Sequence, residues 1–182
     1  MYTSTSGIKN KKTGSPYTNN VNAFGTDKYR FEEEVEPESF EKQAALNEDF
    51  WIEEGTRLSP KISRRLIRIA EDFIGGLDIE VFIEDIRFTG SLANYNWSKY
   101  SDVDLHIVVD FSEIDEDTEL VKSFFDSARM RWNDIHNIKI HGYEVEVYIE
   151  NIGDVHKSSG IYSISQEHWI AEPDPSSVDI DV

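Results

Sequence analysis

The 182 residues contain no cysteine, no long apolar run and few basic side chains relative to acidic ones. Without cysteine there is no disulfide, no thiolate metal site and no thiol nucleophile, which fits a reducing compartment. No apolar stretch approaches the roughly 20 residues of a membrane-spanning helix, so we expect no membrane contact. Because no apolar segment follows Lys9, Lys11 and Lys12, we expect no secretory signal and a cytoplasmic location.

Charge is unevenly distributed over a formal net charge of -18. Residues 1–30 carry five basic residues and one acidic residue, while the rest carries thirteen basic and thirty-five acidic residues. A body this acidic should repel bulk nucleic acid, because nonspecific binding depends on basic side chains that neutralise phosphates. If such a protein handles phosphates, cations must mediate the contact.

Composition divides the chain into three segments. Residues 1–35 are rich in Ser, Thr, Asn and Lys and lack periodicity, so we expect a disordered arm. Residues 36–170 carry the apolar patterns of one folded domain, which suits the chain length. Residues 171–182 form an acidic tail with two prolines, and we expect it to be frayed.

Three helices are predicted, over residues 38–53, 59–76 and 117–136. Ser59 and Pro60 favour a helix start, because serine can cap free amides and proline suits the first turn. A single apolar stripe follows in the second helix and another in the third. The second helix should end at a pair of glycines.

Four strands are predicted, over residues 79–88, 103–109, 143–149 and 161–164, the last being short. Two of them alternate cleanly between apolar and polar residues, which is typical of strands with one buried face. Helices and strands in this order predict an α+β (α/β) domain in which helices pack on a small sheet.

Asp102 and Asp104 stand at the head of the apolar strand 103–109. Since side chains on a strand alternate between faces, the two carboxylates share one face, and one cation can contact both. An Asp-x-Asp pair alone is more often just a solvated strand end. It gains meaning only together with other phosphate-binding or metal-binding groups.

Gly90 and Ser91 follow the strand 79–88, twelve residues before Asp102. Glycine lets the backbone approach a phosphate closely, and a serine hydroxyl with amides at a helix start can bind phosphate oxygens. A Gly-Ser pair alone is more often a simple turn. Together with Asp-x-Asp, the Gly-Ser pair predicts anion-binding groups at the end of the strand 79–88 and metal ligands at the start of the strand 103–109.

A third carboxylate is expected from the strand 143–149. Glu144 and Glu146 both lie opposite its apolar face; we favour Glu146, which lies deeper in the strand, and keep Glu144 as the alternative. Three clustered carboxylates repel one another unless metal or protons compensate. Mg²⁺ prefers carboxylate and phosphate oxygens, and two such ions can stabilise both the attacking and the departing oxygen of a displacement.

The stretch FTGSLANYNWSKYSDVDLHIVVDF resembles the signature of the nucleotidyltransferase superfamily related to DNA polymerase β. Gly90, Ser91, Asp102 and Asp104 carry the signature, and Glu146 best matches the third carboxylate. The resemblance implies a polymerase β-like palm fold with a small mixed sheet and flanking helices. It also implies a nucleoside triphosphate (NTP) such as ATP as donor, Mg²⁺ or Mn²⁺ as cofactor, and pyrophosphate as leaving group.

The chain is also similar to small single-domain nucleotidyltransferases predicted in bacteriophages and bacteria, through LSPKISRRLIRIAEDF and GIYSISQEHWI. If the protein is phage-encoded, this implies the host cytoplasm. Ser101 and Tyr95, which lie in the spacer of the signature, are further candidates for nucleotide contacts, with packing as the alternative for the tyrosine. His106 lies on the carboxylate side of its strand, where a hydrogen-bonded histidine is more common than a metal ligand.

The expected activity is transfer of a nucleoside monophosphate from an NTP to a hydroxyl-bearing acceptor. The acceptor is open between a small molecule, a protein and a nucleic acid end. Fewer than forty residues follow Glu146, too few for the acceptor-binding helical domain of larger superfamily members. One alternative is an antitoxin-like regulatory module that acts through a partner protein; another is a structural protein whose carboxylates bind calcium.

Overall fold

The computed structural model describes residues 42–156 and 159–176. They belong to the unit that begins at Pro37. The predicted arm over residues 1–35, the start of the helix predicted over 38–53, and the tail from residue 177 onward lie outside the described residues.

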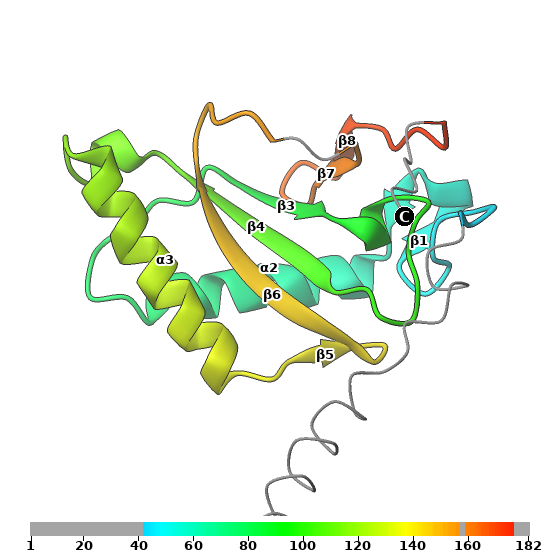
Figure 1. The fold of residues 1–182 in the computed structure, drawn as a ribbon, viewed down its shortest axis with the longest axis horizontal. Helices are drawn as coiled ribbons and strands as arrows, with labels where there is room; N and C mark the ends of the chain where they lie inside the picture. The colour runs from blue at the N-terminus through cyan, green and yellow to red at the C-terminus, as the bar shows by residue number, and fades with distance from the viewer. Residues whose placement is uncertain (1–41, 157–158, 177–182) are drawn as a thin grey trace, which may run out of the picture. The chain divides into compact units, whose positions relative to one another are not determined.

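Six strands form the main sheet, in the order β5-β6-β4-β3-β7-β8 (Figure 1). Their bounds are Asp85–Thr89 for β3, Val103–Val109 for β4, Lys139–Ile140 for β5, Tyr143–Asn151 for β6, Ile161–Ser163 for β7 and His168–Ala171 for β8. β4 and β6 run parallel, and the other neighbours are antiparallel. The sheet is therefore mixed, and the α+β class predicted from the sequence is confirmed.

Helix α3 (Thr118–Ile135) connects the two parallel strands. A parallel pair needs such a crossover, because a tight turn can join only antiparallel strands. Asp117 begins the helix by accepting a hydrogen bond from the amide of Leu120, as an N-cap residue does. The helix predicted over residues 117–136 is therefore confirmed.

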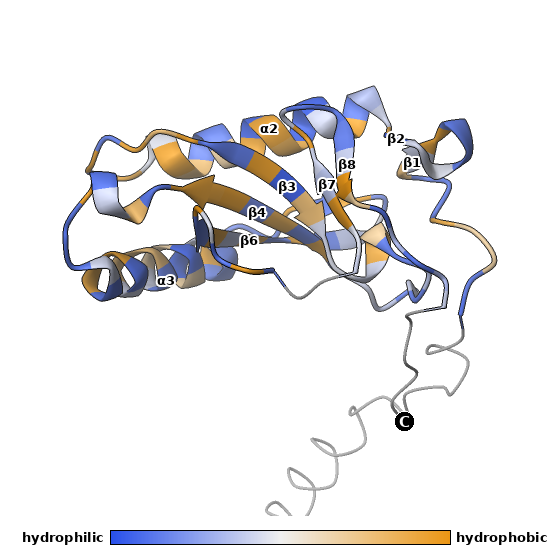
Figure 2. Cartoon of the chain, turned by 90° about the horizontal axis from the view of Figure 1, so that it is seen from above, coloured by the Kyte–Doolittle hydropathy of each residue, from blue (hydrophilic) through white to orange (hydrophobic). Residues whose placement is uncertain are grey.

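Helix α2 (Pro60–Gly75) lies along one face of the sheet (Figure 2). Its predicted apolar stripe is buried and packs in the same core as the inward side chains of β3, β4 and β6. The stripe consists of Ile62, Leu66, Ile69, Ala70 and Phe73. Pro60 opens the helix as predicted, but the Ser59 side chain makes no capping hydrogen bond.

The outer edge of β6 is covered by α3. Asn133 Oδ1 accepts from the amide of Val147 at 3.0 Å, and Asn133 Nδ2 donates to the Val147 carbonyl at 3.2 Å. β5 pairs with β6 only at Tyr143 and Glu144, so a helix side chain takes the place of a neighbouring strand at Val147. α3 also contacts α2, where Trp132 packs edge-on against Phe73.

The helix predicted over residues 38–53 is wrong for its described part. Residues 42–50 form turns and bends, and a two-stranded sheet of β1 (Trp51–Ile52) and β2 (Arg57–Leu58) follows. Asn47 Oδ1 accepts from the amide of Asp49, a local bond that competes with helical pairing. Of the apolar residues in this stretch, Leu46 and Trp51 are buried, whereas Ala44 is exposed.

Two strand predictions need correction. The strand predicted over 79–88 begins only at Asp85, because Asp85 pairs with Val108 and β4 ends one residue later. Residues 79–83 thus lie beyond the partner strand, and Glu84 donates its amide to the Val108 carbonyl near the end of β4. The segment 161–164 is β7 rather than the last strand, because β8 folds back on it through Glu167, which has a left-handed φ of 56°.

None of the helices in the described part of the chain combines the length and apolar character needed to cross a bilayer.

Candidate functional site

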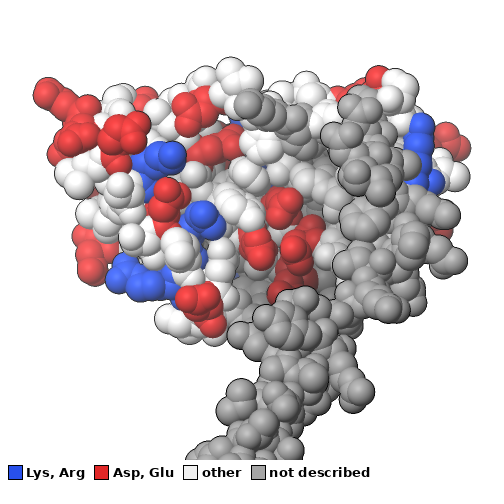
Figure 3. All heavy atoms as spheres, in the orientation of Figure 1, with Lys and Arg blue, Asp and Glu red and all other residues white. Residues whose placement is uncertain are grey.

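Polar side chains occupy the face of β4 and β6 opposite α2. The parallel register pairs Asp104 with Glu146 directly across the two strands, and residues paired in this way point to the same face. Asp102 precedes β4 and, two residues from Asp104, shares its side. Acidic side chains gather near the middle of this face (Figure 3).

Asp102 and Asp104 lie close enough to other carboxylates for the pKa of each to be raised. Burial, followed by the charges of Glu146 and Glu144, raises the pKa of Asp102. Burial, with the charges of Glu146 and Asp102, raises the pKa of Asp104 to about 6, although His106 acts in the opposite direction. Asp102 and Asp104, whose charged forms are disfavoured, make with Glu146 an oxygen donor set that suits a hard cation such as Mg²⁺.

Gly90 lies directly against Asp104. A side chain added at Gly90 would collide with Asp104 Oδ2, and its φ of 81° with ψ of -168° is a conformation that glycine alone adopts readily. The pairing of Thr89 with Asp104 brings this turn to the carboxylate. The two halves of the sequence signature, twelve residues apart, are therefore adjacent in space.

The spacer loop is held by its serines. Ser91 Oγ and Ser101 Oγ are 2.7 Å apart, and Ser101 Oγ also accepts from the amide of Ser98. The loop that follows Gly90 is thus closed on itself just before Asp102. Tyr95 is located elsewhere: it packs against the core and lines a hollow with Leu46.

Glu146 and Glu144 have different surroundings. Tyr148, two residues along the same strand, donates its hydroxyl to Glu146 Oε2 at 2.5 Å. Burial, together with this hydrogen bond, raises the pKa of Tyr148. Glu144 is exposed and pairs with Lys139 at 3.8 Å. Both the register with Asp104 and the tyrosine contact single out Glu146 as the better-placed third carboxylate.

A compact group of metal-ligating side chains was not predicted from the sequence. In residues 42–156 and 159–176, the group whose ligand atoms all lie within 4.8 Å of one another is His106, Glu150 and His156. Asp102, Asp104 and Glu146 are not that compact, in keeping with their mutual repulsion. A cation bridging all three requires their oxygens to come closer than they lie here.

The histidine–glutamate group is electrostatically coupled. Although burial alone would raise it, the pKa of Glu150 is lowered by the hydrogen bond with His106 and by the charges of both histidines and Arg87. Burial, followed by the charge of His106, lowers the pKa of His156. The sequence signal for this group was partial: His106 and Glu150 face the same side of adjacent strands, but His156 belongs to no regular element.

A cationic side chain lies over Tyr148, the residue whose hydroxyl donates to Glu146. The Arg129 guanidinium, on α3, lies 4.8 Å from the centre of the Tyr148 ring. It also pairs with Asp126, one turn earlier on the same helix, at 3.6 Å.

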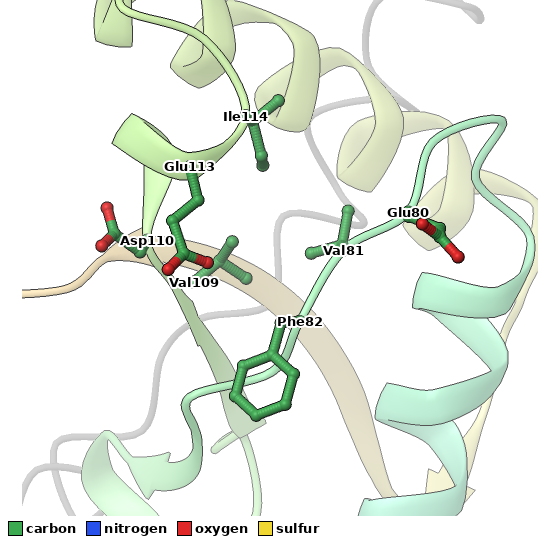
Figure 4. A pocket seen from close by; sticks show the side chains of 7 residues that line it. All are labelled: Glu80, Val81, Phe82, Val109, Asp110, Glu113 and Ile114. Atoms are coloured by element: carbon green, nitrogen blue, oxygen red, sulfur yellow. The ribbon is translucent and has the colours of Figure 1, made fainter.

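A hollow of about 350 Å³ lies at the far end of β4 from Asp102 (Figure 4). None of the residues predicted to bind metal or nucleotide lines it. Its lining consists of Glu80, Val81, Phe82, Val109, Asp110, Glu113 and Ile114. The hollow is therefore separate from the carboxylate face.

Compared with known proteins, the chain matches no family model, no curated protein and no solved structure.

Proposed function

We propose that the protein is a metal-dependent nucleotidyltransferase with a polymerase β-like palm. The observation that carries the proposal is the pairing of Asp104 with Glu146 on parallel strands, with Asp102 beside them and the Gly90 backbone against Asp104. The resemblance of Gly90-Ser91 and Asp102-x-Asp104 to the superfamily signature supports the same assignment.

The proposed chemistry places the triphosphate of an NTP at the turn that begins with Gly90. Amides and the Ser91 hydroxyl contact phosphate oxygens there. Asp102 and Asp104 hold Mg²⁺ or Mn²⁺, which neutralises the triphosphate and lets so acidic a protein bind it. Glu146 holds a second ion or accepts the proton from the acceptor hydroxyl.

In the reaction, the acceptor oxygen attacks the α-phosphorus, and the bond from that phosphorus to the bridging oxygen of pyrophosphate breaks. The acceptor proton passes to Glu146 or to solvent, and pyrophosphate is the leaving group. Positioning and charge neutralisation supply most of the catalysis, as in phosphoryl transfer generally. The acceptor is a hydroxyl-bearing small molecule, protein or nucleic acid end.

The test is label transfer from NTPs carrying ³²P at either the α- or the γ-phosphate, with Mg²⁺ or Mn²⁺ and a cell lysate as the acceptor source. Nucleotidyl transfer moves the α-label to a defined acceptor and leaves the γ-label in pyrophosphate. The double variant Asp102→Asn/Asp104→Asn should lose the transfer. Glu113→Gln, an exposed acidic residue beyond the far end of β4, is the matched control and should retain it.

Binding is measured separately, because the lysate need not contain the acceptor. Calorimetry with a non-hydrolysable α,β-methylene NTP should show Mg²⁺-dependent binding to the wild type and to Glu113→Gln, but not to the double variant. NTP binding that is absent, or that survives in the double variant, would overturn the assignment.

A further inference from the structure

A second cluster of ligand-type side chains lies on the same face as the carboxylates. His106 Nδ1 is 3.0 Å from Glu150 Oε2, and His156 Nε2 is 3.9 Å from the same oxygen. The two imidazole rings are 4.6 Å apart and nearly perpendicular. Three ligand atoms, from β4, β6 and the segment after β6, thus converge on one point.

We propose that His106, Glu150 and His156 form a binding site for a divalent transition-metal ion, with Zn²⁺ as the best fit. Zinc ligands at about 2.0–2.1 Å in tetrahedral geometry lie about 3.3 Å from one another. The observed separations of 3.0 and 3.9 Å lie on either side of that value. An ion with that geometry requires these two separations to change by about 0.3 and about 0.6 Å.

The donor set selects the class of metal. Imidazole nitrogen suits Zn²⁺ and its transition-metal neighbours, whereas Mg²⁺ prefers oxygen alone. Two histidines and one glutamate fill three positions of a tetrahedron and leave the fourth for water or another oxygen ligand, as in many zinc enzymes. The side chains are 14%, 13% and 20% exposed for His106, Glu150 and His156, which leaves a route of entry for the ion.

Outer contacts orient the glutamate. Arg87 Nη1 donates to Glu150 Oε1 at 3.1 Å, and Arg87 Nε donates to Asp85 Oδ2 at 2.9 Å. Asp85 is buried and also accepts from Ser163 Oγ at 2.8 Å. This series of hydrogen bonds holds Oε1 of Glu150 and leaves Oε2 for the ion. Outer-shell partners orient ligands in the same way in other metal sites.

The position of the first histidine is fixed as well. The His106 ring stacks on Tyr148, with centroids 5.0 Å apart and an interplanar angle of 22°. A network of ion pairs without metal would explain the contact between His106 and Glu150. The 3.9 Å between His156 Nε2 and Glu150 Oε2 is too long for a hydrogen bond and is an ion pair only when His156 is protonated, but it also suits two ligands of one ion.

The test uses the full chain without a histidine tag, stripped with chelator and titrated with Zn²⁺ by calorimetry and with Co²⁺ by visible absorption. We expect one equivalent to bind, with the intense bands of four-coordinate Co²⁺ and no displacement by excess Mg²⁺. His106→Ala and His156→Ala should each weaken binding by more than about 10-fold. His168→Ala, an exposed histidine on β8, is the matched control and should bind like the wild type.

Thermal unfolding of each variant checks that the fold is retained, and His106→Gln replaces His106→Ala if the latter is unfolded. Equal Zn²⁺ affinity in the wild type and both site variants, or no binding at all, would overturn the proposal. Asp102→Asn separates it from the nucleotidyltransferase assignment, because that variant should lose NTP chemistry and keep the Zn²⁺ site.

Discussion

The backbone of Gly90 passes so close to Asp104 Oδ2 that no side chain fits between them. This contact joins the turn after β3 to the head of β4. A residue that the sequence favours for phosphate binding is thus also required for the placement of a carboxylate.

Gly90→Ala should therefore be strongly destabilising. The substitution combines a left-handed φ with a collision against Asp104, and we expect a loss of at least about 2 kcal/mol in the free energy of unfolding. Gly142→Ala is the matched control, because Gly142 has a similar φ of 86° but open space around it. Urea denaturation measures both variants, and equal losses would show that the collision contributes nothing.

Asp104→Asn should stabilise the metal-free protein at pH 7. Burial and the charges of Glu146 and Asp102 raise the pKa of Asp104 to about 6 from 3.8, so the folded state binds more protons than the unfolded state between these values. The contribution of Asp104 to the free energy of unfolding of the wild type therefore falls as pH rises from about 4 to about 6, and it is constant above pH 6. The variant should gain about 1–3 kcal/mol over the wild type at pH 7 and almost nothing at pH 4.

The measurement is thermal or urea unfolding in EDTA across that pH range. Asp78→Asn removes an exposed carboxylate far from the cluster in sequence and should show no such pH-dependent gain. A variant at position 104 that is less stable than the wild type at pH 7 would mean that the aspartate makes favourable contacts that outweigh the repulsion.

How much of this site follows from sequence depends on the range of the contacts. Periodicity predicted α2, β4, α3 and β6, because each has an apolar face that one window of sequence reveals. The pairing of Asp104 with Glu146 depends on the register of two strands whose paired residues are forty-two positions apart in the chain. The sequence of either strand alone therefore does not decide whether Glu146 or Glu144 is the third carboxylate. His156, outside any regular element, gave no periodic signal.

The errors have local causes. Residues 42–53 have a helix-like composition, but the Asn47 side chain bonds the backbone, and Glu53 and Glu54 adopt left-handed φ values of 51° and 58°. The strand predicted from residue 79 starts late because no described neighbour extends that far. The strand propensity of a segment does not depend on where its partner strand ends, so it does not predict this boundary.

Tyr148→Phe tests how the third carboxylate is held. The change removes the 2.5 Å hydrogen bond to Glu146 but keeps the ring that stacks on His106. If Glu146 binds metal, loss of this outer contact should raise the Mg²⁺ concentration for half-maximal nucleotidyl transfer by about 10-fold. The free energy of unfolding should change by less than about 1.5 kcal/mol.

The matched control is Tyr143→Phe, which removes a hydroxyl from the same strand, there bonded to Asn47 at 3.3 Å. Its Mg²⁺ dependence should equal that of the wild type. An unchanged Mg²⁺ dependence in the variant at position 148 would mean that the tyrosine contact is only structural.

The two hydrogen bonds between Asn133 and Val147 also bear on whether the sheet edge can pair with another chain. An unpaired strand edge can pair with a strand of another chain, and proteins commonly cover such edges. At Val147 the backbone groups are already occupied, so an incoming strand finds no partner beside the carboxylate face. Among the described residues, no strand pairs with the outer side of β8, the terminal strand at the opposite end of the sheet. A strand added there would lie away from β4 and β6, which carry most of the proposed metal ligands.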